Sequence, residues 1–244
     1  FLVESATEKF ILRRPPFGEK IAKAHDMSRE FKVLEGLKKA GYTKSPLPIH
    51  YCAEESIFGA PFFIMEFIEG VILRNRVPQG IPLDKEAFTD LSRSAIDCLL
   101  ELHNLELENS GLIHLGKPEG YTQRQVEGWV DRYFRAKTNE LPGLEQAASW
   151  LLENIPSTAP LAFIHNDFKY DNIVLDPQQP TQIKGVLDWE MATVGNPLMD
   201  LGTSLAYWAE EKDPEILKLF NLSHLPGNLS RQEIMEYYFS NGTG

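Results

Sequence analysis

The sequence predicts an α+β protein with two lobes, a small one rich in strands and a larger one that is mainly helical. The first third of the chain holds short apolar and aromatic runs around one amphipathic helical pattern. Long helical patterns dominate the remainder. Between them, VILRNRVPQGIP contains Pro78, Gly80 and Pro82 and is typical of a linker. Because strands and helices are segregated along the chain, we expect a small lobe over residues 1–67 and a larger lobe over 68–244.

The small lobe is predicted to contain four strands and one helix. FLVES and KFILRR flank a short connection, which favours a hairpin. DMSREFKVLEGLKKAG is typical of a helix that ends at Gly41, with an apolar stripe at Met27, Phe31, Leu34 and Leu37. PIHYCAEES and APFFIMEFIEG are the two further strands that we expect.

The larger lobe is predicted to be helical around one hairpin. Asp84 can cap a helix whose apolar face contains Phe88, Leu91, Ala95, Leu99 and Leu102. Helices are also predicted in GYTQRQVEGWVDRYFRAK, GLEQAASWLLENI, PLMDLGTSLAYWAEE, DPEILKLF and RQEIMEYYFS. The hairpin is expected from NIVLD and TQIKGVLDW on either side of PQQP.

Charge and cysteine content restrict the partners and the compartment. The formal net charge of −11 argues against a general binder of nucleic acid or of an anionic membrane. No apolar run approaches the ~20 residues of a membrane span, and no signal peptide opens the chain. Cys52 and Cys98 have neither disulfide nor metal spacing. We therefore expect an intracellular, cytoplasmic protein that binds neither nucleic acid nor membrane.

A polar run, FIHNDFKYDNIVLD, precedes the predicted hairpin. His165, Asp167 and Asn172 fit the spacing H-x-D-x-x-x-x-N, and Asp188 ends the second strand. Asn172 and Asp188 are equidistant from Pro180 in the turn, so antiparallel pairing should place them side by side. Two oxygen ligands beside the carboxylate of Asp167 suit Mg²⁺, which also takes phosphate oxygens and water.

These motifs, in this order, resemble those of the aminoglycoside phosphotransferase and choline kinase group of protein-kinase-like enzymes. The sequence is most similar to the subgroup that occurs as a phosphotransferase domain beside acyl-CoA dehydrogenase domains. VLDWEMATVGNPLMDLG, FKVLEGL and APFFIMEFIEG extend the resemblance over nearly the whole chain. It implies a two-lobed kinase-like fold and an enzyme that uses ATP and Mg²⁺ to phosphorylate a hydroxyl group of a small molecule.

The resemblance also assigns roles in the larger lobe. Asp167 would accept the proton of the acceptor hydroxyl or orient that hydroxyl, and Asn172 and Asp188 would hold Mg²⁺. Lys169 resembles the lysine that reaches the γ-phosphate in protein kinases. Asp200 resembles the aspartate that binds the catalytic loop from below, while His165 would brace that loop.

In the small lobe the resemblance implies a nucleotide site. Arg13 stands where many kinases carry a phosphate-binding lysine, and it would pair with Glu30. Met65 would lie at the back of the adenine pocket, and the backbone from Glu66 to Ile68 would form the hinge. A glycine-rich phosphate loop should precede residue 1, so we expect this sequence to be part of a longer protein.

Two departures from protein kinases restrict the substrate. Asn166 replaces the arginine of H-R-D, and Asp188 begins DWE rather than D-F-G. Both argue against control by phosphorylation of an activation loop and against a protein substrate. Net negative charge would suit a cationic acceptor, whereas the subgroup resemblance points to a hydroxylated acyl compound; the sequence leaves both open.

Each assignment has a structural alternative. Asp167, Asn172 and Asp188 could form a capped turn and a hairpin rim, Arg13 and Glu30 could be surface charges, and Lys169 could equally face solvent. For one helical face we favour helix packing over an acceptor site: Tyr121, Arg124, Gln125, Gly128, Trp129 and Arg132. Five histidines carry no motif and are interpreted as structural or surface residues: His25, His50, His103, His114 and His224.

Two other classes of function also remain open. A kinase-like binding module without turnover would lack a catalytic residue, and none is missing among Asp167, Asn172 and Asp188. A metal phosphohydrolase would need further His or Asp ligands at metal spacing, and the histidines are scattered.

Overall fold

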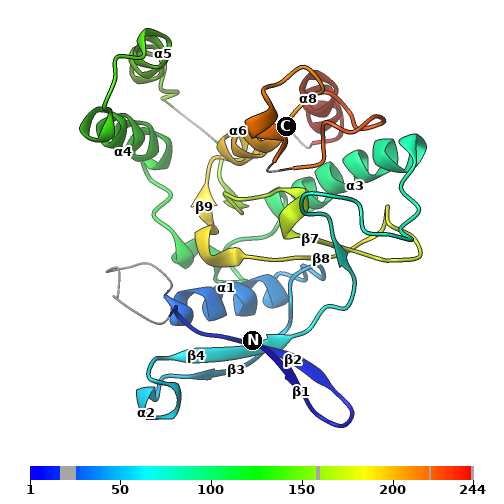
Figure 1. Ribbon diagram of the computed structural model, residues 1–244. Helices are drawn as coiled ribbons and strands as arrows, with labels where there is room; N and C mark the ends of the chain where they lie inside the picture. Colours follow the sequence, from blue (N-terminus) through cyan, green and yellow to red (C-terminus); the bar gives the residue numbers. More distant parts are fainter. Residues whose placement is uncertain (17–25, 158–159, 220, 243–244) are drawn as a thin grey trace.

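The computed structural model describes residues 1–16, 26–157, 160–219 and 221–242 and shows the expected α+β organisation in two lobes (Figure 1). His25, and Phe220 at the end of the predicted helix DPEILKLF, lie outside the described residues. None of the helices in the described ranges is both long enough and apolar enough to cross a membrane. The boundary that we expect between residues 67 and 68 falls one residue after the end of strand β4.

The small lobe is a four-stranded antiparallel sheet in the order β1-β2-β4-β3. Its strands are β1 (Leu2–Glu4), β2 (Lys9–Arg13), β3 (Pro48–Cys52) and β4 (Phe62–Glu66). The predicted hairpin at the start of the chain is confirmed by the pairing of β1 with β2. A short helix that the sequence did not predict, α2 (Glu55–Phe58), joins β3 to β4.

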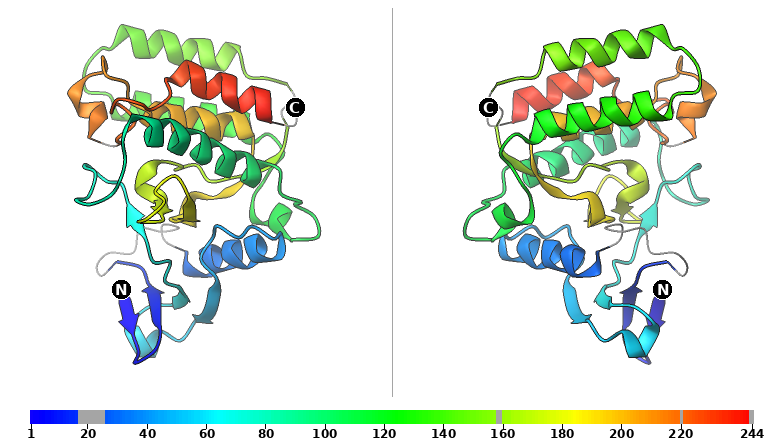
Figure 2. Two further views of the ribbon diagram at one scale, coloured as in Figure 1. Left: turned by 90° about the vertical axis from the view of Figure 1, so that its right-hand side faces the viewer. Right: turned by 90° about the vertical axis from the view of Figure 1, so that its left-hand side faces the viewer.

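Helix α1 (Met27–Lys39) lies between this sheet and the larger lobe, as the views in Figure 2 show. The helix begins where the carboxylate of Asp26 accepts a hydrogen bond from the Arg29 amide at 3.1 Å, an N-cap that satisfies an unpaired amide. Its apolar stripe is largely confirmed, because Met27, Leu34 and Leu37 are buried in the main core. This helix also carries the buried Glu30.

The larger lobe is mainly helical. Its α-helices are α3 (Lys85–His103), α4 (Tyr121–Ala136), α5 (Pro142–Glu153), α6 (Pro197–Tyr207), α7 (Glu215–Lys218) and α8 (Arg231–Asn241). Its short 3₁₀ turns are η1 (Leu112–Leu115), η2 (Tyr170–Asn172) and η3 (Trp189–Met191). The predicted apolar face of α3 is buried from Phe88 to Leu102. Helices α4 and α5 stand apart from α3, α6 and α8 (Figure 1).

Two small antiparallel sheets, β5-β7-β8 and β6-β9, are built from short strands. Strand β7 (Ile173–Leu175) pairs with β8 (Ile183–Val186) and with β5 (Val71–Ile72), which lies within the predicted linker. Strand β6 (Ala162–Ile164) pairs with β9 (Thr193–Gly195).

The predicted register of the β7–β8 hairpin is wrong by one residue. Ile173 lies opposite Val186, and the Leu187 amide donates to the Asn172 carbonyl at 2.8 Å. Asn172 therefore faces Leu187, not Asp188. The cause lies in the turn: Leu175 pairs with Ile183, so the hairpin is centred on residue 179 and not on Pro180, and a register shift between Val174 and Leu175 recovers part of this offset.

Candidate active site

The loop that connects β6 to β7 is held from below by one buried carboxylate. Asp200, at the start of α6, accepts the His165 amide at 2.7 Å and the Asn166 amide at 2.7 Å, which confirms the predicted contact. Burial alone would raise the pKa of Asp200, but hydrogen bonding and charge from His103 and the His165 amide outweigh it and lower the pKa. Asp200 is therefore a carboxylate, and it holds Asn166 in a left-handed conformation, φ 65°.

His165 connects this loop to the end of strand β8. Its Nδ1 accepts the Asp167 amide at 3.2 Å, so the ring proton is on Nε2, which donates to the Leu187 carbonyl at 2.9 Å. Complete burial lowers the pKa of His165 and keeps the ring neutral. The ring thus fixes the distance between the segments that carry Asp167 and Asp188, and the bracing contact that we expected is present.

Asp167 is positioned by Lys169 and Asn172. The Lys169 ammonium lies 2.9 Å from each carboxylate oxygen. It also lies 4.6 Å from the ring centroid of Tyr207, so the solvent-facing alternative for Lys169 is wrong. Burial lowers the pKa of Lys169, but the hydrogen bonds to Asp167 outweigh it and raise the pKa, which keeps the ammonium charged. The contact with the γ-phosphate stays a prediction.

Asn172 and Asp188 provide two oxygen donors at one side of this loop. The Asn172 amide nitrogen donates to the Asp167 carbonyl at 2.8 Å and to its carboxylate at 2.9 Å. With the nitrogen engaged, Oδ1 is the atom of Asn172 that could bind a cation. Asp188 directly precedes η3 with φ 67°. Both residues line a cavity of about 620 Å³ between the lobes.

This donor set fits Mg²⁺ rather than a site built from protein ligands alone. Within the described ranges, no group of three His, Cys, Asp or Glu side chains is placed to hold a metal ion. Mg²⁺ commonly takes one or two protein oxygens and completes its shell with phosphate oxygens and water. Asn172 and Asp188 therefore provide what a Mg²⁺–nucleotide complex needs.

Arg13 joins the small lobe to the same carboxylates. Its Nε lies 2.8 Å from Glu30, which is 3% exposed, so the predicted contact is confirmed and the surface-charge alternative is wrong. Its Nη2 donates to Asp188 at 2.8 Å and to Glu190 at 3.1 Å. Burial raises the pKa of Glu30 to about 7, against the opposing effect of Arg13, and the charges of Asp188 and Glu190 raise it further. Glu190 was missed in the sequence, where its one signal is its position two residues after Asp188.

The residues predicted to form the hinge line this cleft. Met65, Glu66 and Ile68 are all in the wall of the 620 Å³ cavity, together with Val174 and Leu187. The Glu66 amide donates to the Leu47 carbonyl at 2.9 Å. Recognition of an adenine edge would therefore fall on other backbone groups of residues 66–68.

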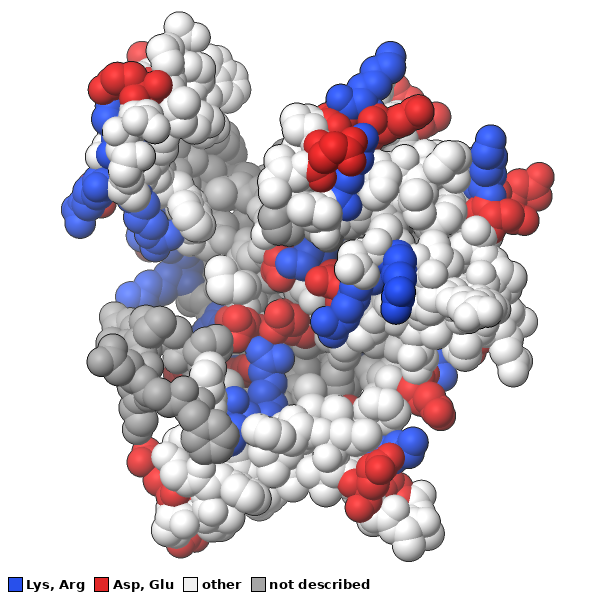
Figure 3. Space-filling model, in the orientation of Figure 1, with Lys and Arg blue, Asp and Glu red and all other residues white. Residues whose placement is uncertain are grey.

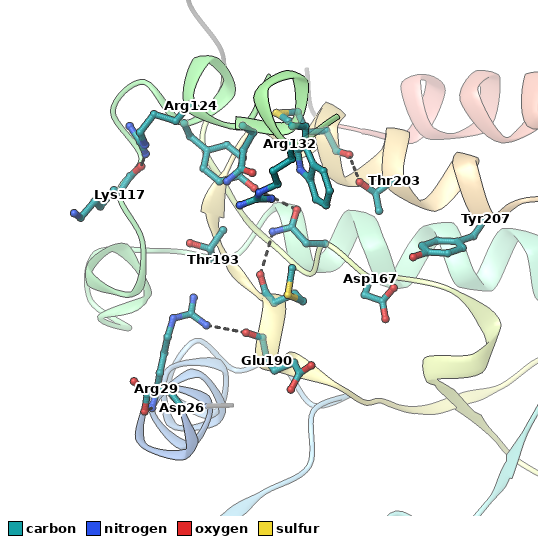
Figure 4. A pocket seen from close by; sticks show the side chains of 16 residues that line it. Asp26, Arg29, Lys117, Arg124, Arg132, Asp167, Glu190, Thr193, Thr203 and Tyr207 are labelled. Carbon is teal, nitrogen blue, oxygen red and sulfur yellow. Dashed lines mark hydrogen bonds between the residues drawn. The ribbon is translucent and has the colours of Figure 1, made fainter. Parts of the chain in front are cut away.

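A second cavity, of about 820 Å³, opens on the other side of the catalytic loop. Asp167 lies in its wall, and Thr203 and Tyr207 face it from α6 (Figure 4). Glu190 lines both cavities. The carboxylate of Asp167 is thus exposed to one cavity, while the donors Asn172 and Asp188 belong to the other.

Helix α4, where we favoured helix packing, forms the far wall of this second cavity, and an acceptor role for its residues stays a prediction. Tyr121, Arg124, Gln125, Trp129 and Arg132 line the cavity, while Gly128 does not. Tyr121 alone is buried among the residues of α4, all of which are described, and Trp129 is 61% exposed. The Arg132 guanidinium lies 4.7 Å from the Trp129 ring centroid, and Arg124 donates to the backbone carbonyls of Lys117 and Glu119. Among the described residues, neither arginine forms an ion pair with an acid.

Positive charge exceeds negative charge in the cavity wall. Its charged residues are Arg29, Lys117, Arg124 and Arg132 against Asp26, Asp167 and Glu190. Arg29 and Arg124 donate to backbone carbonyls, which leaves Lys117 and Arg132 as the cations best placed to meet a ligand. Figure 3 shows the hollow beside the α4–α5 pair, with blue side chains on that side.

His103 is the functional neighbour that the sequence did not reveal. Its Nε2 lies 3.1 Å from Asp200, and its Nδ1 lies 2.7 Å from the Tyr238 hydroxyl on α8. It is structural, as interpreted, but it supports the aspartate that orients the catalytic loop. His50, His114 and His224 line neither cavity.

Comparison with known proteins agrees with this geometry. The family model described as "Phosphotransferase enzyme family" matches residues 1–232. The rat protein named acyl-CoA dehydrogenase family member 11 is 34% identical over 241 residues, which cover 98% of this chain and 30% of that protein. The chain therefore spans about a third of the length of that relative.

Two solved structures show the same fold. A candidate aminoglycoside phosphotransferase from Ralstonia eutropha superimposes with a TM-score of 0.80 at 25% identity, over 98% of this chain and 70% of that one. A streptomycin–ATP ternary complex of APH(2")-IIa gives a TM-score of 0.60 at 16% identity, over 99% of this chain and 77% of that one. The kinase-like fold that the sequence predicted is confirmed.

Proposed function

The chain belongs to the phosphotransferase enzyme family, and we propose that it transfers the γ-phosphate of ATP, bound with Mg²⁺, to a hydroxyl group of a small molecule. One observation carries the proposal. The catalytic loop separates two cavities, with Asn172 and Asp188 in one and Asp167 in the other. Phosphoryl transfer needs a donor and an acceptor held on opposite sides of one point, with charge neutralised there.

The cleft between the lobes is the proposed nucleotide site. Met65 and the backbone from Glu66 to Ile68 would contact the adenine, and Arg13 would contact the phosphates. Asn172 and Asp188 would hold Mg²⁺, which neutralises charge on the phosphate oxygens when it is bound. The ATP complex of the kinase-like neighbour supports this use of the cleft.

The second cavity is the proposed acceptor site. The acceptor oxygen forms a bond to the γ-phosphorus as the bond to the β,γ-bridging oxygen breaks, and ADP leaves. Asp167 would accept the hydroxyl proton or orient that hydroxyl for in-line attack. Lys169 would move from Asp167 toward the transferred phosphate, keeping one cation beside the reacting oxygens.

The walls of the cavity favour an acceptor with an anionic group over a polycation. An aminoglycoside carries several ammonium groups, and these would meet Lys117 and Arg132. Trp129, Met191 and Met199 add apolar surface to the same walls. A hydroxylated acyl compound with an acidic group fits both features, and the acyl-CoA dehydrogenase relative supports this class.

A non-catalytic nucleotide-binding module is the alternative, favoured by one observation. Both oxygens of Asp167 are engaged by Lys169, and Asp188 is engaged by Arg13, so the catalytic carboxylates are neutralised within the protein. In that case the site would bind nucleotide without transfer.

The test is a screen of hydroxyl compounds with γ-labelled ATP and Mg²⁺, beside a titration of nucleotide affinity. We expect label in an acidic hydroxyacyl compound and none in aminoglycosides. Binding of ATP with no transfer to any acceptor would favour the non-catalytic module. Absence of ATP binding would contradict both the phosphotransferase and the nucleotide-binding module.

A further inference from the structure

Helix α1 packs on the small-lobe sheet, where the Phe31 ring contacts those of Tyr51 and Phe63, and it is also bound to the larger lobe. The Arg29 guanidinium reaches two segments of the larger lobe at once. Its Nη1 donates to the Glu190 carbonyl at 3.0 Å, and its Nη2 donates to the Leu115 carbonyl at 3.2 Å and also to the Ala192 carbonyl. The dashed line in Figure 4 marks the bond to Glu190.

Two turns further along the same face, α1 also contacts η1, the 3₁₀ turn that contains Leu115. A Cβ atom on Gly36 would lie 2.6 Å from the Leu112 side chain in η1, so a glycine permits this close approach. Residues seven apart lie on one face of a helix, so Arg29 and Gly36 both face η1.

The chain after α1 is fastened in the same way. The Lys44 carbonyl accepts the Val186 amide at 2.6 Å, which ties this segment to strand β8. The Tyr42 ring lies 5.8 Å from that of Trp189, in η3, in an edge-to-face arrangement. Arg29 and Gly36 on α1, and Tyr42 and Lys44 after it, thus contact η1, η3 or β8.

We propose that Arg29 is a positioning residue that holds α1, and with it Glu30, at a fixed place relative to Asp188. Glu30 is the neighbour of Arg29 on α1, Glu190 lies within the turn η3 that follows Asp188, and Ala192 ends that turn. One guanidinium therefore sets the separation between the two carboxylates that Arg13 bridges. This inference rests on the proposed use of the cleft for nucleotide.

Only a planar fork spans these three carbonyls, which makes lysine a sharp test. Arg29→Ala removes all three hydrogen bonds, and Arg29→Lys keeps the charge but not the fork geometry. The readout is the Kd of Mg·ATP without acceptor, since Arg29 also lines the acceptor cavity. We expect both variants to raise this Kd roughly tenfold, the lower end of the range for residues that orient metal ligands.

Arg124→Ala is the matched control. Arg124 also lines the acceptor cavity and donates to two backbone carbonyls, but both belong to the adjacent segment 117–119. It should leave the Kd of Mg·ATP unchanged. An unchanged Kd in the Arg29 variants, with a raised KM for the acceptor alone, would overturn the proposal and make Arg29 an acceptor contact.

Amide hydrogen exchange provides a readout that does not depend on nucleotide. We expect Arg29→Ala, or Arg29→Lys if the alanine variant does not fold, to speed exchange in α1 and in residues 189–193, with α3 and α8 unchanged. Unchanged exchange in α1 would overturn the anchoring. If the wild-type protein binds no ATP but α1 loosens in the variants, the proposed function fails while the anchoring of α1 stands.

Discussion

The two cavities that meet at the catalytic loop are built in opposite ways. In the nucleotide cleft the charged side chains bind one another: Arg13 contacts Glu30, Asp188 and Glu190. In the acceptor cavity two of the charged residues, Arg124 and Arg132, come from helix α4, which stands apart from α3, α6 and α8, and the Trp129 ring there is 61% exposed. Under the proposed function, the difference implies that the reaction is fixed by a network of paired charges, whereas the choice of acceptor depends on a few side chains that can change without disturbing it.

The largest effect should come from the residue between the two cavities. Asp167→Asn should lower turnover by roughly 10²–10⁴, the usual contribution of a positioned acid or base. The affinity for Mg·ATP should hardly change, because Asp167 does not line the nucleotide cleft. Steady-state turnover is measured beside equilibrium binding of Mg·ATP. Wild-type turnover in this variant would contradict the assignment.

Asp188→Asn should alter the nucleotide cleft itself. Losing one carboxylate charge should weaken Mg·ATP binding and lower the rate, each by at least about tenfold. Raising the Mg²⁺ concentration should recover part of the loss, which a titration of rate against Mg²⁺ would detect. If Mg·ATP affinity is unchanged, Asp188 is not a metal ligand.

The acceptor cavity should respond only in the KM of the acceptor. Arg132→Ala and Lys117→Ala each remove one cation, and a hydrogen bond to a charged group contributes about 1.5–3 kcal/mol, so KM should rise at least roughly tenfold. The Kd of Mg·ATP should not change. Arg135→Ala is the control, since Arg135 lies on the same helix, pairs with Asp131 at 2.8 Å and does not line the cavity. If KM rises in the Arg135→Ala control as well, the effect does not depend on lining the cavity, and the assignment of Lys117 and Arg132 to the acceptor is wrong.

The smallest effect is a pH dependence that arises from Glu30, which lines the nucleotide cleft and not the acceptor cavity. Burial raises the pKa of Glu30 to about 7, above its ordinary 4.5, so the folded state binds this proton more tightly than the unfolded chain. The stability from this group is therefore present at low pH and is lost as pH rises from about 4.5 to 7. Ionised Glu30 holds Arg13, so Mg·ATP affinity should rise over the upper part of that range.

Glu30→Gln tests this sign, because glutamine does not titrate. The variant should lose the pH step in both melting temperature and Mg·ATP affinity near pH 7. An identical step in the variant would assign the titration to another group.

The sequence predicted which residues come together at the cleft between the lobes, because most of the determinants are local. The spacing of His165, Asp167 and Asn172 lies within one loop, and a short hairpin brings Asp188 beside it. The contact between Arg13 and Glu30 followed from the family alignment of one strand and one helix.

What the sequence could not predict depends on distant contacts. The one-residue shift in the hairpin arises from a turn centred on residue 179, combined with an irregularity between Val174 and Leu175, and neither is signalled by a turn residue. His103 reaches Asp200 from another helix, 97 positions away in the chain. The helical pattern of α4 was correct, but where α4 stands is set by the segments at its two ends, so the sequence could not show that its arginines line a cavity.

A structure with Mg²⁺ and a non-hydrolysable ATP analogue tests most directly the claim that the two cavities meet at one reaction centre. The account predicts the metal on Asn172 Oδ1 and Asp188, the triphosphate beside Arg13, and the γ-phosphate directed at Asp167 from the cleft. A metal bound away from Asn172 and Asp188, or a γ-phosphate directed away from Asp167, would contradict it.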